Sequence, residues 1–512
     1  DVLLAYILAE HGVELPDMRA DTLERRLSDP DLPEHVKELI RIRLQASMNT
    51  VGKYKALLRS VCRDRRLRGC HQFRGAGRTG RWAHRLFQPG NLMRPTMGHE
   101  MIDVAVESIK TGAVDLIFDN VMSAVSNAVR GVIVAPPGKK MVIADLSNIE
   151  GRVAAWTAGE EWKLQAFRDF DTILGYEEKG GKRKAVRKGP DLYVKSYCGA
   201  FNVDRLSDNE YEAFLQRQIG KVMELMFQYG GGVGAWLTGA ATYGIDLAKM
   251  TEQVFDTLPR KTVEEAENFL QWLYEQIEQK YEIAKAKLDL EFTGGKITEE
   301  QWLEKSQKLS ELHKNPASIE AAKAKARYGL PEKVFATCDA LKRLWRQAHP
   351  AVSSYWKELE ETAREAINNP GVTFPCRKVK MRRSGAWLRI ALPSGRELCY
   401  PEPEIAKDGS ISYIGLNQYT RQWGRVKTYG GKLFENIVQA AACDQLAECM
   451  PIAEEHGYAV VLHVHDELVC ETPDTSDFTS DILATLMCSE MSWNRGLPLA
   501  AAGFETYRYR KD

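Results

Sequence analysis

Short apolar runs that end on carboxylates are the clearest pattern in the chain. One run, Met141–Ala144, precedes Asp145 and then a segment with helical spacing, so it predicts a buried strand that leads into a helix. Two further apolar runs flank His465, Asp466 and Glu467 and predict a β-hairpin with these three residues at its turn. Two strand-borne aspartates that are far apart in the sequence can then lie side by side in one sheet.

A third pattern predicts an amphipathic helix over Arg217–Gly230. Arg217, Lys221, Leu225 and Tyr229 recur every four residues and share one face, while the apolar residues between them face a core. We expect the two cations near the start of this helix to add to the positive end of its dipole, which suits a triphosphate. The glycines that follow Tyr229 are expected to end the helix and to serve as a hinge.

The rest of the chain is expected to be mostly helical, with few strands. In chain order, the patterns predict helices over 1–55, a basic glycine-bounded loop over 179–189, charged helices with a helical hairpin near 292–295 over 250–336, a β-hairpin over 389–400, a helix that carries Asn436 and Gln439, and a helix over 482–493.

Composition narrows the class of protein without deciding it. The 512 residues are enough for several subdomains, and 70 Lys plus Arg balance 70 Asp plus Glu, so a nucleic-acid-binding protein would have to gather its cations on one surface. The ten cysteines form no Cys-x-x-Cys pair, which argues against a zinc site and a disulfide framework. No spanning apolar run appears, so we expect an intracellular, cytoplasmic protein without a membrane partner. Because residue 1 is Asp rather than Met, we expect the chain to be a fragment.

Paired aspartates suggest metal chemistry. Carboxylate oxygens suit magnesium, and two such ions about 3.5–4 Å apart stabilise both the attacking and the leaving oxygen of an in-line phosphoryl transfer. Ordinary roles compete with this interpretation: an aspartate at a strand end is often a cap, an acidic hairpin tip is often only solvated, and an Arg/Lys pair four residues apart often lies on a solvated helix edge.

Five motifs together resemble family A (DNA polymerase I-like) DNA polymerases of the bacteriophage type, polymerase portion only. They occur in the family's order: the minor-groove segment at Thr79–Trp82 and Gln88–Leu92, the first palm motif at Asp145–Glu150, the fingers helix at Arg217–Gly230, the helix segment Gln439–Asp444, and the second palm motif His465–Glu467.

The resemblance implies an α+β fold shaped as a right hand, with a small antiparallel palm sheet and mostly helical fingers and thumb. It places the thumb at 1–80, the first part of the palm at 81–160, the fingers at 161–430 with a helical insertion at about 250–336, and the second part of the palm at 431–512.

The resemblance also implies the site. Two magnesium ions, which manganese can replace, would be held by Asp145, Asp466 and the carbonyl of Leu146. The catalytic residues would be Asp145, Asp466, Lys221 and Glu467. Nucleotide would be bound by Arg217, Lys221, Leu225, Tyr229, Glu150 and Tyr193, with Glu150 blocking a ribose 2′-hydroxyl. Primer-template would be bound by Arg81, Arg85, Asn91, Gln439 and His465.

Two positions depart from the family pattern. Leu225 stands where the family commonly has Phe or Tyr under the incoming sugar, and Tyr193 stands where it often has a histidine near the triphosphate. A branched aliphatic side chain has no hydroxyl to replace a missing 3′-OH, so we expect discrimination against dideoxynucleotides.

The function expected is template-directed DNA synthesis from dNTPs on a primer, with release of pyrophosphate, by a monomer that serves phage genome replication in the host cytoplasm. Three alternatives stay open: a single-subunit RNA polymerase, a catalytically inactive nucleic-acid-binding subunit, and a magnesium-dependent nuclease. Glu150 and Glu467 favour DNA over RNA synthesis, and a nuclease needs no triphosphate helix.

Overall fold

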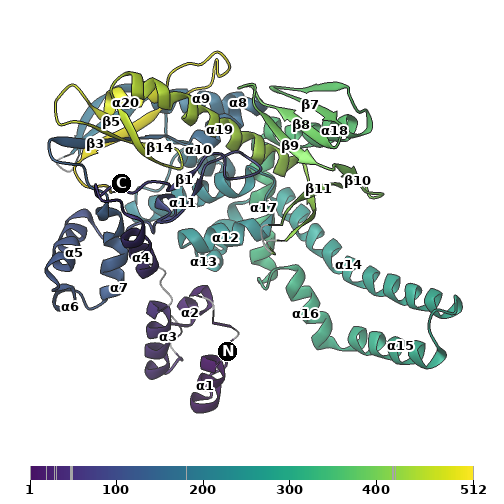
Figure 1. Cartoon of the computed structure of the whole chain (residues 1–512). Helices are drawn as coiled ribbons and strands as arrows, with labels where there is room; N and C mark the ends of the chain where they lie inside the picture. Colours follow the sequence, from purple (N-terminus) through teal and green to yellow (C-terminus); the bar gives the residue numbers. More distant parts are fainter. Residues whose placement is uncertain are drawn as a thin grey trace. The chain divides into compact units, whose positions relative to one another are not determined.

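A computed structural model describes residues 2–15, 17–18, 20–27, 29, 31–46, 50–179, 182–417, 420 and 422–510. It divides into two compact units: unit 1 comprises residues 1–146, 446–489 and 501–512, and unit 2 comprises residues 147–445 and 490–500. Each unit combines helices with small antiparallel sheets (Figure 1), which confirms the α+β class. The predictions over residues 47–49 and 180–181 lie outside the described residues.

Unit 1 holds a four-stranded sheet, a two-stranded sheet and short helices. Its elements are α1 (Val2–His11), α2 (Ala20–Leu27), α3 (Glu34–Ala46), α4 (Thr50–Ser60), β1 (His71–Gln72), β2 (Ala83–His84), η1 (Pro89–Asn91), α5 (His99–Thr111), α6 (Val114–Ile117), α7 (Val121–Ala128), η2 (Val129–Val132), β3 (Lys139–Leu146), β13 (Ala459–Val464), β14 (Glu467–Pro473), α20 (Ser480–Met487) and β15 (Ala501–Thr506).

The four-stranded sheet brings three distant chain segments together. Its strand order is β13-β14-β3-β15 and all its pairs are antiparallel. Strand β3 is central and apolar, and Val142, Ile143 and Ala144 are almost fully buried, because both faces of the strand are covered. Helix α20 packs against β3 and β15. The predicted strand before Asp145 and the hairpin at 459–471 are therefore confirmed.

The helices predicted over 1–55 are confirmed in the residues that the structure describes, as α1–α4. A core of its own lies among α1–α3, formed by Ile7, Leu15, Leu23, Leu32, Val36 and Ile40. One helix prediction in this unit has a wrong boundary. The helix expected over 482–493 ends at Met487, because the Asn494 side chain accepts a hydrogen bond from the Met491 backbone N–H and holds a turn there instead.

Unit 2 is mostly helical. Its elements are α8 (Ile149–Ala158), α9 (Glu161–Asp171), β4 (Ile173–Lys179), β5 (Lys182–Arg187), α10 (Leu192–Phe201), α11 (Glu210–Phe227), α12 (Val233–Tyr243), α13 (Leu247–Val254), η3 (Phe255–Thr257), α14 (Arg260–Thr293), α15 (Glu299–Lys314), α16 (Pro316–Ala326), α17 (Glu332–Ala348), α18 (Pro350–Asn368), β6 (Thr373–Cys376), β7 (Val379–Ser384), β8 (Trp387–Ala391), β9 (Glu397–Pro401), β10 (Glu404–Ile405), β11 (Ile411–Leu416), β12 (Trp423–Thr428) and α19 (Gly430–Glu455), which continues into unit 1 after Gln445.

The predicted fingers helix exists as α11, but it begins seven residues earlier than expected. Its N-cap is Asn209, whose side chain accepts hydrogen bonds from the backbone N–H groups of Tyr211 and Glu212. Arg217 is therefore the eighth residue of α11, and Lys221 lies further along it. The expectation that these cations reinforce the positive end of the helix dipole is wrong, since the dipole acts within the first turn.

The basic segment over 179–189 was expected to be a loop, and this is also wrong where the structure describes it. Strands β4 and β5 pair in antiparallel register with Glu177 opposite Lys184, and such cross-strand pairs of opposite charge stabilise a hairpin. The two hairpins predicted for this unit are confirmed. Helices α14 and α15 form the helical hairpin near 292–295 and lie side by side in Figure 1, and strands β8 and β9 pair to form the β-hairpin over 389–400.

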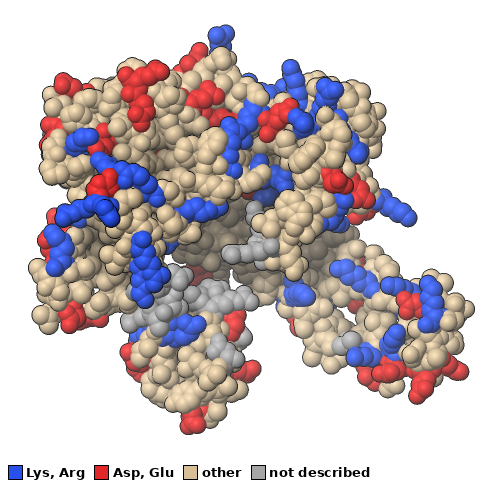
Figure 2. All heavy atoms as spheres, viewed as in Figure 1, with Lys and Arg blue, Asp and Glu red and all other residues tan. Residues whose placement is uncertain are grey.

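Positive and negative side chains both occur on α14 and α15 in the face that Figure 2 draws.

Within the described residues, no helix combines the length and the apolar character that crossing a membrane requires.

Candidate active site

The sheet of unit 1 brings the two predicted metal-binding aspartates to the same end of neighbouring strands. Asp145 is near the end of β3 and is paired in register with Glu467, the first residue of β14. Asp466 directly precedes β14, and its backbone carbonyl accepts a hydrogen bond of 3.1 Å from the Leu146 N–H. The hairpin turn consists of His465 and Asp466, and His465 has a left-handed backbone with φ 56°. The two predicted aspartates therefore lie on neighbouring backbone segments at one edge of the sheet.

The groups gathered at this edge are hard oxygen donors. The two aspartates are partly buried, and Arg81 Nη2 lies 3.5 Å from Asp466 Oδ1, so a cation already approaches one of the carboxylates. Among the residues that the structure describes, no cluster of three or more His, Cys, Asp or Glu side chains is arranged for a metal ion. The ligand set expected from the sequence has only two such side chains, Asp145 and Asp466, and its third donor is the backbone carbonyl of Leu146. All three are oxygen donors, which magnesium prefers. The residues present fit the ion.

Glu467, the third acidic candidate, is held inside the protein. Its side chain is 3% exposed, and Tyr509 donates a 2.6 Å hydrogen bond to its carboxylate. Arg130 Nη1 lies 3.4 Å from the Tyr509 hydroxyl. Burial, followed by the nearby carboxylate charge, raises the pKa of Tyr509 well above its usual range. The hydroxyl therefore remains a donor, and the Glu467 carboxylate is fixed by it.

A cluster of histidines beside the hairpin was missed by the sequence interpretation. The His463 ring lies 4.3 Å from that of His71 and 6.0 Å from that of His84, and it contacts Trp82 edge-on at 4.7 Å. Desolvation, and then the charges of the neighbouring histidines, lowers the pKa of His463 to about 3 and that of His84 to about 4. His463 is two positions before His465, and no sequence signal connects it with His71 or His84, which lie almost 400 residues away.

The primer-template candidates of unit 1 are on or near its surface. Arg85 is exposed and donates hydrogen bonds to the His84 carbonyl and to Gln72 Oε1. Asn91 is exposed at the end of η1. In the arginine-rich segment just upstream, residues 63–68, Arg66 is not available to a phosphate without rearrangement, because it forms a 2.9 Å ion pair with the buried Glu471.

In unit 2, the two cations of α11 are held by neighbouring side chains. Arg217 Nε donates a 2.6 Å hydrogen bond to Asp191, and its guanidinium lies 5.2 Å from the ring centroid of Tyr193. Asp191 is the N-cap of α10. Lys221 Nζ lies 4.5 Å from the ring centroid of Tyr243. Arg217, Lys221 and Tyr193 are therefore close together on α10–α12, as expected for parts of one binding surface.

The remaining candidates of unit 2 lie on or after α11, on α8 and on α19. Tyr229 follows the helix and donates a 2.9 Å hydrogen bond to Glu150, which is in the first turn of α8. Leu225 is 36% exposed. Gln439 is half-buried on α19. At Gly231, an added Cβ would lie 1.9 Å from the Met226 carbonyl oxygen, so only glycine fits where the chain leaves α11.

Buried Glu224 is a second feature that sequence reasoning missed. Its carboxylate accepts hydrogen bonds from Lys163 at 2.5 Å, Ser196 at 2.6 Å and Trp345 at 2.9 Å, and His349 Nε2 lies 3.2 Å away. Burial alone would raise the pKa of Glu224, but the charges of Lys163 and His349 outweigh it and hold the pKa well below its usual value. These contacts tie α9, α10 and α17 to α11.

No protein-family model matches the chain. A DNA polymerase of Bacillus phage SP02 is 30% identical over 526 residues, an alignment that covers 99% of this chain and 62% of that protein. The chain thus spans less than two thirds of the length of this relative. A solved structure, the POL domain of Pol1 from M. smegmatis in complex with DNA primer-template and dNTP, is 14% identical with a TM-score of 0.48 and covers 99% of this chain and 60% of its own. Over almost its whole length the chain is therefore similar to a phage DNA polymerase, in keeping with the resemblance that the motifs indicated.

Proposed function

We propose that this chain is the polymerase portion of a DNA-directed DNA polymerase, which adds dNMPs to the 3′-hydroxyl of a primer on a DNA template and releases pyrophosphate. The observation that supports this most directly is the adjacency of Asp145 and Asp466 at one end of the four-stranded sheet. The similarity to a phage DNA polymerase over almost the whole chain supports the same activity.

In this proposal Asp145, Asp466 and the Leu146 carbonyl hold two magnesium ions, for which manganese can substitute. When bound, the ions would supply charge neutralisation at the attacking and leaving oxygens. Arg217 and Lys221 bind the triphosphate, and Lys221 donates a proton to the leaving pyrophosphate. Glu467 supports the Asp145 strand through its register pairing and its bond from Tyr509.

The other residues contact the sugar, the base or the primer-template. Glu150 blocks a 2′-hydroxyl, Leu225 packs against the sugar, Tyr193 lies near the triphosphate, and Tyr229 stacks near the templating base. Duplex DNA is contacted by Arg81, Arg85, Asn91, Gln439 and His465.

We assign residues 1–80 to the thumb, 81–160 and 431–512 to the palm, and 161–430 to the fingers. The pairing of β3 with β14 and β15 supports placing both palm segments in one sheet. We further propose that the chain acts as a monomer in phage genome replication, in the host cytoplasm.

The test is primer extension with each dNTP and each NTP, with and without magnesium, by the wild-type chain, Asp145→Asn and Asp466→Asn. Either substitution should lower the incorporation rate by about a thousandfold or more, since the ions contribute several kcal/mol to the transition state and each 1.36 kcal/mol is tenfold. Binding of primer-template should change little, because it rests on many phosphate contacts.

The matched control is Asp103→Asn, which removes an exposed carboxylate on α5. Preference for NTPs would favour the RNA polymerase alternative, and magnesium-dependent cleavage without incorporation would favour a nuclease. DNA binding without incorporation by the wild-type chain would favour the inactive binding subunit.

A further inference from the structure

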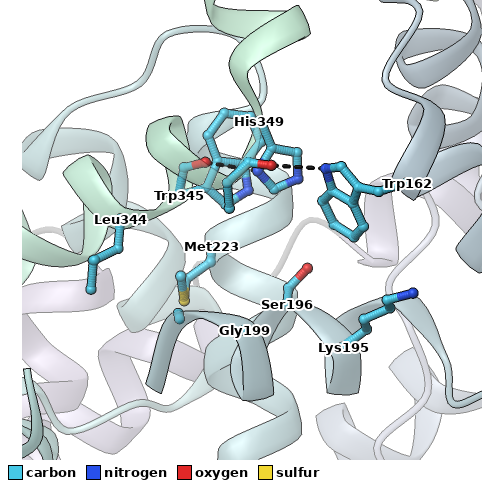
Figure 3. Close-up of a pocket in the computed structure, with 10 residues that line it drawn as sticks. Trp162, Lys195, Ser196, Gly199, Met223, Leu344, Trp345 and His349 are labelled. Carbon is cyan, nitrogen blue, oxygen red and sulfur yellow. Dashed lines mark hydrogen bonds between the residues drawn. The ribbon is translucent and has the colours of Figure 1, made fainter. Parts of the chain in front are cut away.

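A partly open pocket lies among the helices α9, α10, α11 and α17 of unit 2 (Figure 3). It has a volume of about 210 Å³ and a mostly apolar lining. Met223 of α11 contributes to the lining, and the next residue is Glu224, the centre of the buried hydrogen-bond network. None of the residues assigned above to nucleotide or primer binding lines it.

One side of the pocket is a rigid aromatic wall. The rings of Trp345 and His349 stack at 3.9 Å with an interplanar angle of 14°, and Trp162 meets His349 edge-on at 4.9 Å. Trp162 Nε1 donates a 2.8 Å hydrogen bond to the Ala348 carbonyl, which fixes the indole at the side of the pocket. Trp345 is fixed in turn by its hydrogen bond to Glu224. Because the rings are already held in place, binding a flat partner costs little ordering of side chains.

Two polar side chains of the pocket lining, Lys195 and His349, indicate which charge a ligand would carry. Lys195 is half-buried with its ammonium 5.8 Å from the Trp162 ring centroid, and within the described residues it makes no hydrogen bond or ion pair. His349 is 1% exposed; its Nδ1 lies 2.7 Å from the Trp345 carbonyl, whereas Nε2 approaches Glu224 at 3.2 Å without the geometry of a hydrogen bond. A negatively charged group on a ligand is therefore attracted to Lys195. It has no place near the Glu224 carboxylate, which contacts His349 and Trp345.

We propose that this pocket binds a small, flat aromatic molecule that carries one negative charge. Its ring lies against Trp162 and the Trp345–His349 stack, and its anionic group meets Lys195. Pockets for drug-sized ligands measure about 300–1,000 Å³, so the volume here fits one or two fused rings. Aromatic pairs gain attraction beyond the area that they bury. The proposal does not depend on the polymerase assignment, although the ligand would contact Met223 on the helix that carries Arg217 and Lys221.

The experiment is calorimetric titration of the full chain with indole-3-carboxylate and, separately, with neutral indole. For a ligand of this size we expect a Kd on the order of 100 µM for the carboxylate. Lys195→Met keeps the aliphatic stem and removes the charge, so it should weaken the carboxylate about fivefold to tenfold and leave indole within about twofold. Lys308→Met, at an exposed lysine of α15, is the matched control and should change neither.

A blocking variant tests the location. Gly199 lines the pocket, and a Cβ added there meets no atom within 4 Å, so Gly199→Leu adds a large side chain to the pocket lining without a clash at its Cβ. It should abolish binding of both probes while the melting temperature stays within a few degrees of the wild type. No binding by the wild type at 5 mM (about fifty times the expected Kd) would overturn the proposal. So would unchanged binding by a folded Gly199→Leu chain, or equal losses of both probes in Lys195→Met.

Discussion

Tyr229 donates a 2.9 Å hydrogen bond to the carboxylate of Glu150, which joins the residue just beyond α11 to the first turn of α8. Burial, and then the charge of Glu150, raises the pKa of Tyr229 well above its usual value, so its hydroxyl remains a donor at any working pH. The roles proposed above for the two residues are separate, stacking for Tyr229 and sugar selection for Glu150. The bond indicates that Tyr229 also holds the carboxylate in one position.

Sugar selection should therefore depend on both partners. Glu150→Ala removes the blocking group and should raise the ratio of kcat/KM for an NTP to that for the matching dNTP. Tyr229→Phe keeps the ring and removes the bond, and it should raise the same ratio by about 10–100-fold, since a hydrogen bond to a charged group contributes about 1.5–3 kcal/mol. Single-nucleotide incorporation kinetics measure the ratio.

Glu150→Gln is the control for this pair, because it retains the size and an acceptor oxygen. It should stay closer to the wild type than Glu150→Ala does. If Glu150→Ala left ribonucleotide use unchanged, Glu150 would have no part in sugar selection.

Leu225 predicts strong discrimination against dideoxynucleotides, because its side chain has no hydroxyl to take the place of the missing 3′-OH. Leu225→Tyr should lower the dNTP/ddNTP preference by about 10–100-fold, the contribution of one such hydrogen bond. Leu225→Phe adds a ring without a hydroxyl and serves as the control. Potent termination by ddNTPs in the wild-type chain at equal concentration would contradict the prediction.

The buried network around Glu224 should be a main source of stability in unit 2. Lys163→Met removes the closest cation from a carboxylate that is 3% exposed, and it should lower the free energy of unfolding by about 3–5 kcal/mol. The urea midpoint, compared at unchanged m value, measures this. Arg205→Met breaks the exposed pair with Asp208 and should cost about 1 kcal/mol or less. Equal effects of the two substitutions would show that the network contributes no more than a surface pair.

The buried histidine should make unit 1 sensitive to acid. The pKa of His463 is about 3 in the folded chain, below the value of about 6.5 for an unfolded chain, so the unfolded state binds the extra proton first. Stability is therefore lost as the pH falls below about 6.5, by about 2 kcal/mol from this group between pH 7 and pH 5. His463→Leu should flatten the pH dependence of the free energy of unfolding by that amount.

His456→Leu, at an exposed histidine outside the cluster, is the control for the acid measurement. An unchanged slope in His463→Leu would mean that this ring does not carry the proton linkage.

The elements nearest the chemistry were the most predictable from the sequence. The apolar run before Asp145 and the paired runs around Asp466 have the length, the continuous apolar character and the flanking turn residues of short buried strands, and the structure forms both. The start of α11 was not predictable from its periodic face, because Asn209 caps the helix eight residues before Arg217 and the intervening positions do not continue that face. The β4–β5 hairpin was missed because its strands are charged and exposed, so no apolar alternation marks them.

Contacts between distant residues were beyond sequence reasoning for a physical reason. Lys163 and Glu224 are 61 positions apart, and each alone is typical of a solvated helix face. Only the packing of α9 on its neighbours removes both from water, and then the charges must pair. The bond between Tyr229 and Glu150 is a similar case, since neither residue type predicts the other.

The central place of β3 in its sheet has a consequence for biosynthesis. During translation more than three hundred residues must follow this apolar strand before β13 and β14 can pair with it. Its other edge stays open until β15 has left the ribosome, since Ala501–Thr506 pairs with that side. An unpaired strand edge invites association with other chains, so nascent molecules of this protein should be good clients for chaperones until the last strand is added.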